Sequence, residues 1–476
     1  MGILYKADSK SLVYIEDDWN NAKGITIIKN NSINELYKND LVNLIEAKDY
    51  DEALRSATII KYKRKDNKYT NFFKNFKFFY SKLGENRRDS WLLGFAEDFL
   101  NKCQVIVIKS WNIEQAIGMF NSLNSTGMPL SDADIISAQL YSHYGDKTVF
   151  ENRWRSIIEN ASKLELEKIV NIDSVLQEAM YILRTKNKEY REGQVTTPGV
   201  RRYYLTEHID RLKKPEDLIS LFENILSIWE QIKNYPSIRL LSKFNENFKF
   251  FLITYLQRYE VNDITEEEIR TIVESLLKLF AVLELVDSGY SSSRFKTFLF
   301  NENFRLVDKD CPMESIESDF RNHIDKTWGR DAIKEALLDY SGNALVYLNE
   351  YLYATSKKKP FSLDSTVNIE HIMPSSGRNL DQIRIDAGIK DKDEFTAYAN
   401  KLGNKILLEE SINKALGNDW FRTKKAGDVS SKNGYIGSKY PLAESLSHYP
   451  EDLWTKEDID IATEKVANRI LNFIFS

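Results

Sequence analysis

Three short segments of the chain carry side chains that could act together in hydrolysis. Glu370 and His371 are adjacent, Asn404 follows a glycine, and Asn413 comes shortly after it. A neutral imidazole at pH 7 suits a general base that takes a proton from water. Carboxylate and amide oxygens suit a hard cation such as Mg²⁺, which keeps several waters and needs few protein ligands. These residue types predict metal-assisted hydrolysis of a phosphoester.

The neighbouring residues predict the elements that position these side chains. Val367–Ile369 and Lys405–Leu408 are short runs of β-branched and apolar residues, which are typical of strands. Met373-Pro374 should end the first strand, because proline lacks the N–H that a strand ladder needs. A short helix is expected over Ser411–Leu416. Adjacent side chains on a strand point to opposite faces, so the acid and the histidine should reach different groups where the strand becomes loop.

A structural alternative exists for each of these residues. An isolated Glu-His pair says little, and a lone histidine is commonly a satisfied core or surface residue. The five histidines are His143, His208, His323, His371 and His448. Among them, His371 alone lies between a strand-like segment and a proline. The order of acid-His, Gly-Asn and Asn favours a site over the structural alternative.

Composition describes a globular protein that is rich in helices. The chain has 476 residues, with 42% hydrophobic and 29% charged residues but few Pro (9) and Gly (19). The length suggests two or three domains, and the scarcity of helix breakers favours helices. No apolar run approaches the ~18–20 residues of a membrane span, and no signal peptide is seen, so a cytoplasmic location is expected. Cys103 and Cys311 are too far apart in sequence to indicate a Cys-based zinc site.

Charge is distributed unevenly along the chain. The formal net charge is −5, which argues against non-specific nucleic-acid binding over the whole surface. Residues 357–440 hold 15 Lys and Arg against 11 Asp and Glu, a local balance of +4. This weakly basic segment is compatible with a local DNA site, although surface charge varies this much by chance.

Hydrophobic periodicity predicts a mainly helical body followed by a different kind of domain. Apolar residues recur with helical spacing from about residue 150 to 353, with a polar break over Lys186–Arg202. Ala354–Pro360 reads as a linker because a run of charge is closed by proline. We therefore predict a helical body over 1–355 and an α+β domain over 356–476, closed by a helix over Asp458–Phe473.

The first part of the chain contains several local signals. Phe72–Tyr80 interleaves aromatic residues with lysine, which fits either a stacking platform for bases or, more commonly, a helix packed by large side chains. Gln104–Lys109 predicts a strand, a helix should follow over Ile113–Leu123, and Asn124–Ser131 has loop composition. Ser131 and Asp134 have the spacing of an N-terminal capping pair.

The C-terminal third resembles the HNH nuclease domain of the GmrSD-type restriction family, whose members cut modified or foreign DNA. The matching segments are IEHIMP, LGNKILL, SINKALGN and DWFRTKK, followed by the closing pattern Tyr435–Leu446. The order of motifs is also similar to the HNH domains of CRISPR effector nucleases. The resemblance implies a ββα-metal fold and a DNA endonuclease that depends on Mg²⁺ or Mn²⁺.

The resemblance also implies a role for each matching residue. His371 would be the general base, and Glu370 and Asn413 would be metal ligands. Asn404 would orient His371 or the loop that bears it. Lys424 would contact the scissile phosphate or stabilise the transition state, although a pair of adjacent lysines is usually solvated. Glu370 replaces the Asp of many HNH sites, which leaves open a degenerate site that binds DNA or protein without cutting.

The resemblance extends upstream to Ala116–Asp134 and, more weakly, to Gly342–Tyr351. The family's first module begins with a nucleotide-associated domain that carries a Gly-Gln-Gln-Arg-like motif, and the chain has neither this motif nor a GxxxxGK[ST] loop. We therefore expect this N-terminal domain to be missing. In that case the chain would be a fragment or a shortened protein, or a subunit that needs a separate nucleotide-binding partner. An oligomer is also possible.

Overall fold

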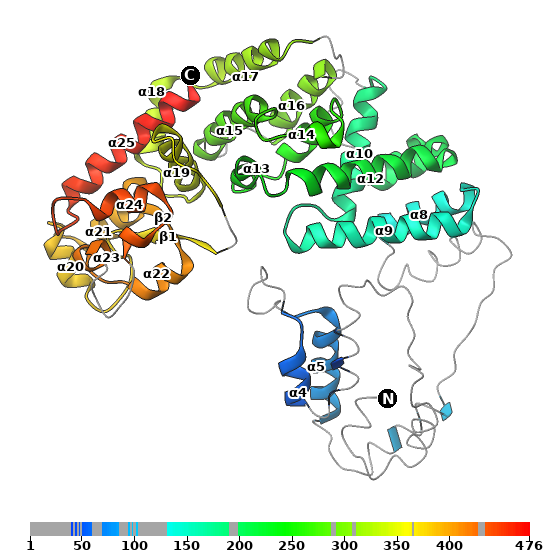
Figure 1. Ribbon diagram of the computed structural model, residues 1–476, viewed down its shortest axis with the longest axis horizontal. Coiled ribbons are helices and arrows are strands. Elements are labelled where there is room, and N and C mark those ends of the chain that lie inside the picture. The colour runs from blue at the N-terminus through cyan, green and yellow to red at the C-terminus, as the bar shows by residue number, and fades with distance from the viewer. Residues whose placement is uncertain are drawn as a thin grey trace. The chain divides into compact units, whose positions relative to one another are not determined.

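The computed structural model describes residues 131–189, 199–286, 292–306, 311–363, 366–426 and 434–476, together with short stretches between residues 40 and 102 (Figure 1). The strand predicted over 104–109, the helix over 113–123 and all but the last residue of the loop over 124–131 lie outside these residues. Contacts divide the chain into two compact units. One contains residues 1–180 and 198–229, and the other contains residues 181–197 and 230–476.

The first unit is mainly helical in its described part, with one isolated β-bridge between Ile59 and Tyr69. Its elements are α4 (Tyr50–Ser56), α5 (Asn71–Gly84), α8 (Asp132–His143), α9 (Lys147–Leu166), most of α10 (Ile172–Lys186), α11 (Val200–Arg202), the π-helix η2 (Tyr203–Glu207), the 3₁₀-helix η3 (Ile209–Lys213) and most of α12 (Pro215–Ile232). Trp229 is fully buried and its indole N–H donates to the buried carboxylate of Glu178 at 2.7 Å. This bond satisfies the indole donor inside the core.

Two local predictions in this unit are confirmed. Ser131 caps α8 through the backbone N–H of Asp134, whose carboxylate accepts from the backbone of Ser131, so the capping box is complete. The aromatic run of residues 72–80 lies within helix α5, where Phe73 and Phe76 are buried in a small aromatic core. Packing of large side chains on a helix therefore accounts for this part of the run. Phe78 and Phe79 are instead about half exposed.

The second unit adds a small sheet to a set of helices. Its helices before the sheet are α13 (Pro236–Leu241), α14 (Phe248–Leu256), η4 (Val261–Asp263), α15 (Arg270–Leu285), α16 (Ser292–Leu306), α17 (Met313–Thr327), α18 (Arg330–Leu338) and α19 (Ala344–Ser356). The elements that follow are β1 (Val367–His371), α20 (Leu380–Asp386), α21 (Lys392–Asn400), η5 (Leu402–Asn404), β2 (Lys405–Glu409), α22 (Glu410–Leu416), α23 (Phe421–Ala426), η6 (Tyr435–Gly437), α24 (Pro441–Ser447) and α25 (Lys456–Ile474).

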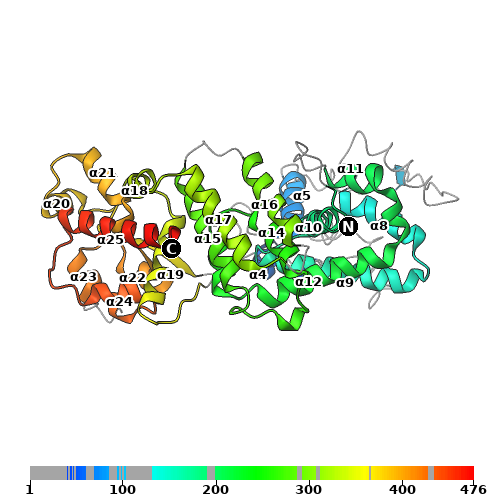
Figure 2. The ribbon, with the colours of Figure 1, turned by 90° about the horizontal axis from the view of Figure 1, so that it is seen from above.

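The mainly helical character predicted from the sequence is confirmed, and α25 covers the helix predicted over 458–473. A capping box fixes its start, because the Thr455 hydroxyl accepts from the N–H of Asp458. Helix α25 packs against α15, α18, α19 and η5 (Figure 2). The boundary predicted after residue 355 falls within the last turn of α19 and inside the second unit, so residues 356–476 share a core with the helices that precede them.

A carboxyl group is buried where α19 meets α24. Glu350 is fully buried; its Oε1 accepts from the backbone N–H of Leu442 at 3.1 Å, and its Oε2 has no hydrogen-bond partner in the described part of the chain. Burial raises the pKa of Glu350 to about 7, with a smaller contribution from Glu409 and opposing ones from the Leu442 N–H and Arg469. The carboxyl group of Glu350 therefore binds a proton more tightly in the folded chain than in the unfolded chain.

We expect Glu350→Gln to stabilise the protein at alkaline pH. The folded pKa of about 7 lies above the ordinary 4.5. The stabilising protonated form is thus fully present below pH 4.5 and is lost as the pH rises through 7. Each unit of pKa shift corresponds to about 1.4 kcal/mol, so the cost at pH 8 is on the order of 3 kcal/mol. Thermal unfolding of the wild type and the variant at pH 5 and pH 8 measures it.

The matched control is Glu335→Gln, which makes the same change at an exposed position on α18. It should leave the pH dependence of unfolding as it is in the wild type. If Glu350→Gln gave the same difference from wild type at both pH values, the buried carboxyl would not be the source of the pH dependence.

Candidate active site

The two strands form an antiparallel pair that leads directly into a helix. Their register runs from Val367 opposite Glu409 to His371 opposite Lys405. The backbone N–H of Ile372 also donates to the carbonyl of Asn404 at 2.9 Å, so pairing extends one residue beyond the strand. Helix α22 begins at the residue after β2. The two predicted strands and the short helix after them are present, but the predicted long loop between the strands instead contains α20, α21 and η5.

Asn404 holds the loop that follows His371. Its side chain is fully buried and bonds both backbone groups of Met373, accepting from the N–H at 2.7 Å and donating to the carbonyl at 2.9 Å. Its amide also donates to the carbonyl of Ala399 at 2.9 Å. An amide side chain is suited to this position because it offers both an acceptor and a donor to the backbone N–H and C=O of one residue. Asn404 therefore fixes the position of the backbone two residues after His371.

Glu370 is a buried carboxylate with two partners on one oxygen. It is 5% exposed, its Oε1 lies 2.5 Å from Nζ of Lys424, and the same oxygen accepts from the hydroxyl of Tyr435 at 3.1 Å. Burial raises the pKa of Glu370, and the ammonium of Lys424 and the Tyr435 hydroxyl partly offset that effect. This carboxylate is therefore part of a buried ion pair.

His371 is the last residue of β1 and is partly exposed. Its cross-strand neighbour Lys405 is buried and donates to the carbonyls of Ser341 and Gly342, at 2.5 and 3.1 Å. Burial, with smaller contributions from the positive charges of Lys405 and Lys424, lowers the pKa of His371 to about 4. The imidazole is therefore neutral at pH 7, which is the state that a general base requires.

Lys424 is buried, although a pair of adjacent lysines in the sequence usually indicates exposure to solvent. It belongs to α23, is 1% exposed, and donates to the carbonyl of His371 at 2.7 Å as well as pairing with Glu370. The neighbouring Lys425 lies nearer the surface, where it donates to Tyr449, Glu451 and Asp452. Of the two adjacent lysines, the one assigned to a phosphate is thus the one without exposed surface.

Asn413 lies on α22 and is partly exposed. Its backbone carbonyl accepts from Gly417, and its side-chain amide has no hydrogen-bond partner in the described residues. The amide is therefore open to a ligand. Within the same described residues, no group of three or more His, Cys, Asp or Glu side chains gathers at a distance suited to a metal ion.

Tyr435 and Lys405 are site residues that sequence reasoning did not single out. Tyr435 is fully buried against Glu370, and Lys405 is buried opposite His371. Both stood within quoted motifs, LGNKILL and the segment Tyr435–Leu446. The available signal for Lys405 was its place at the start of the apolar strand segment Lys405–Leu408, because a lysine in a buried strand needs specific acceptors.

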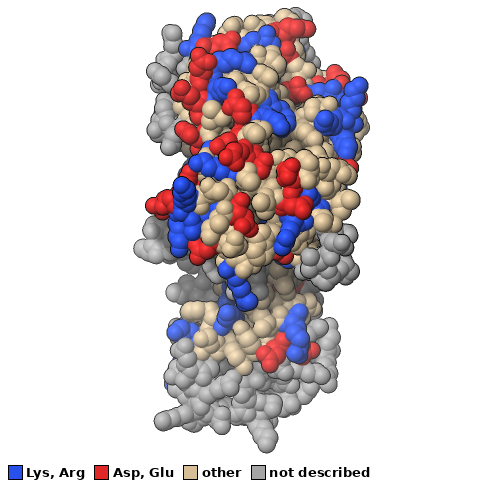
Figure 3. Space-filling model, turned by 90° about the vertical axis from the view of Figure 1, so that its left-hand side faces the viewer, with Lys and Arg blue, Asp and Glu red and all other residues tan. Residues whose placement is uncertain are grey.

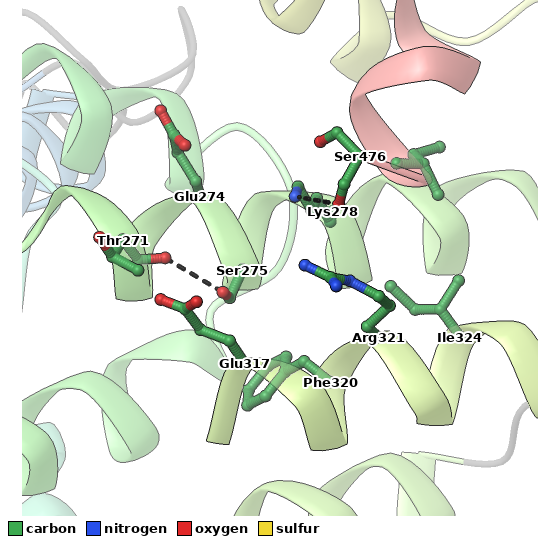
Figure 4. A pocket seen from close by; sticks show the side chains of 10 residues that line it. Thr271, Glu274, Ser275, Lys278, Glu317, Phe320, Arg321, Ile324 and Ser476 are labelled. Atoms are coloured by element: carbon green, nitrogen blue, oxygen red, sulfur yellow. Dashed lines mark hydrogen bonds between the residues drawn. The ribbon is translucent and has the colours of Figure 1, made fainter. Parts of the chain in front are cut away.

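A separate pocket of about 120 Å³ lies between α15, α17 and the C-terminal end of α25 (Figure 4). Its walls carry charges of both signs, with Lys278 and Arg321 on one side and Glu274 and Glu317 on the other. It contains none of the residues discussed above. The pocket therefore does not contribute to the site built on the two strands.

Two family models match the chain. The model of the GmrSD restriction endonuclease N-terminal domain matches residues 3–141, and the model of the GmrSD restriction endonuclease C-terminal domain matches residues 314–469. The chain belongs to the GmrSD restriction endonuclease family. None of the curated proteins matches it. Both domains of a restriction endonuclease are thus represented in this one polypeptide.

The expectation that the N-terminal domain is missing was wrong, because its model matches residues 3–141. That expectation rested on the absence of a four-residue motif and of a GxxxxGK[ST] loop. A short motif can change while the remaining positions of a domain persist, and those positions carry the match. The reason for expecting a separate nucleotide-binding subunit is thereby removed.

Among the described helices, none combines the length and apolarity that a membrane span requires.

Proposed function

We propose that the chain is a metal-dependent, HNH-type DNA endonuclease that acts in defence against phage or modified foreign DNA. The observation that supports it most is the arrangement at the end of β1. There a neutral histidine follows a buried acidic residue, Asn404 fixes the next loop, and α22 presents an open amide. Family membership supports restriction of DNA as the purpose of the site.

His371 is the general base in this proposal. Its neutral imidazole would take the proton from a water that attacks the phosphorus in line with the leaving oxygen. The side chain stands at the last position of β1, where the chain leaves the sheet, and its partial exposure gives a substrate access. Anchoring of the neighbouring backbone keeps the imidazole in place, which favours reaction by fixing its orientation.

The donor set is consistent with a hard divalent cation. Glu370 offers a carboxylate and Asn413 an amide oxygen, and Mg²⁺ commonly takes one or two protein oxygens together with waters and substrate phosphate. Bound there, Mg²⁺ or Mn²⁺ would supply positive charge to the phosphate and the leaving oxygen. Because Lys424 already neutralises Glu370, we propose that the DNA phosphate provides part of the site.

Asn413→Ala should raise the Mg²⁺ concentration that gives half-maximal cleavage by roughly 10–100-fold, because one of two protein donors is lost. Cleavage of supercoiled plasmid across a Mg²⁺ series measures the change. Asn379→Ala is the control, since it removes an exposed amide that makes no capping bond at the start of α20. An unchanged metal dependence in Asn413→Ala would rule out the ligand role.

One observation favours a second candidate, a domain that binds DNA or protein without cutting. The carboxylate of Glu370 is engaged by Lys424 and Tyr435, which limits its freedom to bind a metal. Calorimetric titration of the protein with Mn²⁺, with and without DNA, separates the two candidates. Binding that appears in the presence of DNA supports the nuclease, and absence of binding in both titrations supports the second candidate.

The charge pattern bears on how DNA would be held. On the face drawn in Figure 3, Lys and Arg side chains are interspersed with Asp and Glu. This face therefore offers DNA a mixed surface and not a continuous basic tract. Phosphate contacts still dominate the affinity of most DNA-binding proteins, so we expect binding to weaken steeply with salt.

A single HNH site cuts one strand per event, so a double-strand break would require two events or a second copy of the chain.

A further inference from the structure

The ammonium of Lys424 has three acceptors close to it. They are Oε1 of Glu370 at 2.5 Å, the carbonyl oxygen of His371 at 2.7 Å and the carbonyl oxygen of Ile372 at 3.4 Å. A lysine ammonium has three N–H donors, and this arrangement provides an acceptor for each of them. The side chain is also 1% exposed, so no donor remains for a phosphate that approaches from solvent.

The acceptors belong to the segment that carries the general base. Lys424 bonds the carbonyls of residues 371 and 372, and Asn404 bonds both backbone groups of residue 373. The N–H of Ile372 completes the set by donating to the backbone carbonyl of Asn404. Three successive residues, the last of β1 and the two that follow it, are thus anchored by Lys424 of α23 and by Asn404 of η5.

Tyr435 completes this anchor. Its fully buried hydroxyl donates to the Glu370 oxygen that pairs with Lys424, and its helical turn η6 packs against α23. The carboxylate therefore has two donors and the lysine has three acceptors. Such a fully satisfied buried pair is fixed in geometry, because moving either member leaves a buried charge without its partner.

We propose that Lys424 is a positioning residue, which holds the backbone of His371 and Ile372 and the carboxylate of Glu370, and that it does not contact the DNA phosphate. Tyr435 supports it through Glu370. The proposal rests on the proposed function, since it concerns the orientation of the general base. It replaces the role that family resemblance implies for Lys424.

The experiment compares Lys424→Met with Lys425→Met in the full-length chain. Both remove one lysine charge from α23, but Lys425 bonds Tyr449, Glu451 and Asp452 and none of the β1 segment. We expect Lys424→Met to lower kcat by about 10–100-fold, because a small displacement of a catalytic group can cost that much. Lys425→Met should leave kcat unchanged.

The salt dependence of DNA affinity distinguishes positioning from phosphate contact. Loss of one phosphate contact reduces the slope of log K against log salt by about 0.9. With Lys424 in a positioning role, the slope of Lys424→Met should equal that of the wild type, and amide hydrogen exchange over residues 367–376 should become faster. A slope reduced by about one, with exchange as in the wild type, would overturn the proposal.

Tyr435→Phe provides a second test in case Lys424→Met does not fold. It removes a single hydroxyl and keeps the ring, so kcat should fall less, the salt slope should not change, and exchange over 367–376 should increase. Unchanged kcat and exchange would count against the anchor. If the wild type bound DNA but did not cut it, the proposed function would fail, whereas the slope and exchange measurements would still decide the role of Lys424.

Discussion

His371→Ala lowers the rate of DNA cleavage by roughly 10²–10⁴-fold, which is the usual contribution of a general base. The expected loss has a structural reason. The imidazole is neutral at pH 7 because burial and two nearby lysines lower its pKa to about 4, and no other histidine lies in either strand. Single-turnover cleavage of plasmid at saturating protein measures the chemical step without a contribution from DNA binding.

The unfolding temperature should change little in the same variant. His371 is partly exposed at the end of β1, and its anchoring bonds are made by its backbone, which alanine retains. His448→Ala is the matched control, because it makes the same change at an exposed position behind α24. A large fall in the unfolding temperature of His371→Ala, together with the loss of cleavage, would indicate a structural residue and not a base.

Gly403→Ala should destabilise the protein by on the order of 3 kcal/mol and reduce cleavage with it. A Cβ on Gly403 would lie 2.3 Å from the backbone nitrogen of Thr463, 2.6 Å from its Oγ1 and 2.7 Å from the carbonyl oxygen of Ile459. Two of these atoms belong to the backbone of α25, which cannot move aside cheaply. The helix must shift away from η5, and Asn404 and β2, which follow directly, must shift with it.

Gly329→Ala is the control for this substitution. It adds the same methyl group at a glycine with nothing within 4 Å of the new Cβ and with an ordinary φ of −75°. Thermal unfolding of the two variants should differ by several degrees, since a loss of 1 kcal/mol lowers the unfolding temperature of a domain of this size by about 2–4 °C. Equal unfolding temperatures would mean that α25 accommodates the methyl group.

The elements of the site follow from local sequence, which explains why they could be predicted. Val367–Ile369 and Lys405–Leu408 are short apolar and β-branched runs, and Pro374 limits the first of them, so β1 ends at His371. The capping pair of Ser131 and Asp134 is equally local. In each case the residues that determine the conformation lie within a few positions of one another.

The surroundings of the site depend on residues far apart in sequence, and these were not predictable. Lys424 next to another lysine on a short helix has the pattern of a solvated face, and its burial depends on Glu370 and on two backbone carbonyls from β1 and the loop after it. The need for glycine at 403 likewise comes from α25, about sixty residues later. Such contacts exist only after the chain has folded.

Family resemblance located Lys424 in the sequence but did not predict the contacts of its ammonium group. A motif match indicates that a lysine stands at this point of the family pattern, but it does not say which atoms the ammonium contacts. Its three bonds and its burial are properties of the folded chain. The N-terminal domain, in turn, is present over residues 3–141 although its short signature motif is not found in the chain.

Cleavage of supercoiled plasmid by the purified chain tests the central claim most directly. The plasmid is supplied in modified and unmodified forms, with Mg²⁺ or Mn²⁺ or with EDTA, and the wild type is run beside His371→Ala. We predict nicked or linear product from the wild type with either metal, none with EDTA, and almost none from His371→Ala. Cutting that persists in EDTA or in His371→Ala, or no cutting of either plasmid by the wild type, would contradict a metal-assisted reaction with His371 as its base.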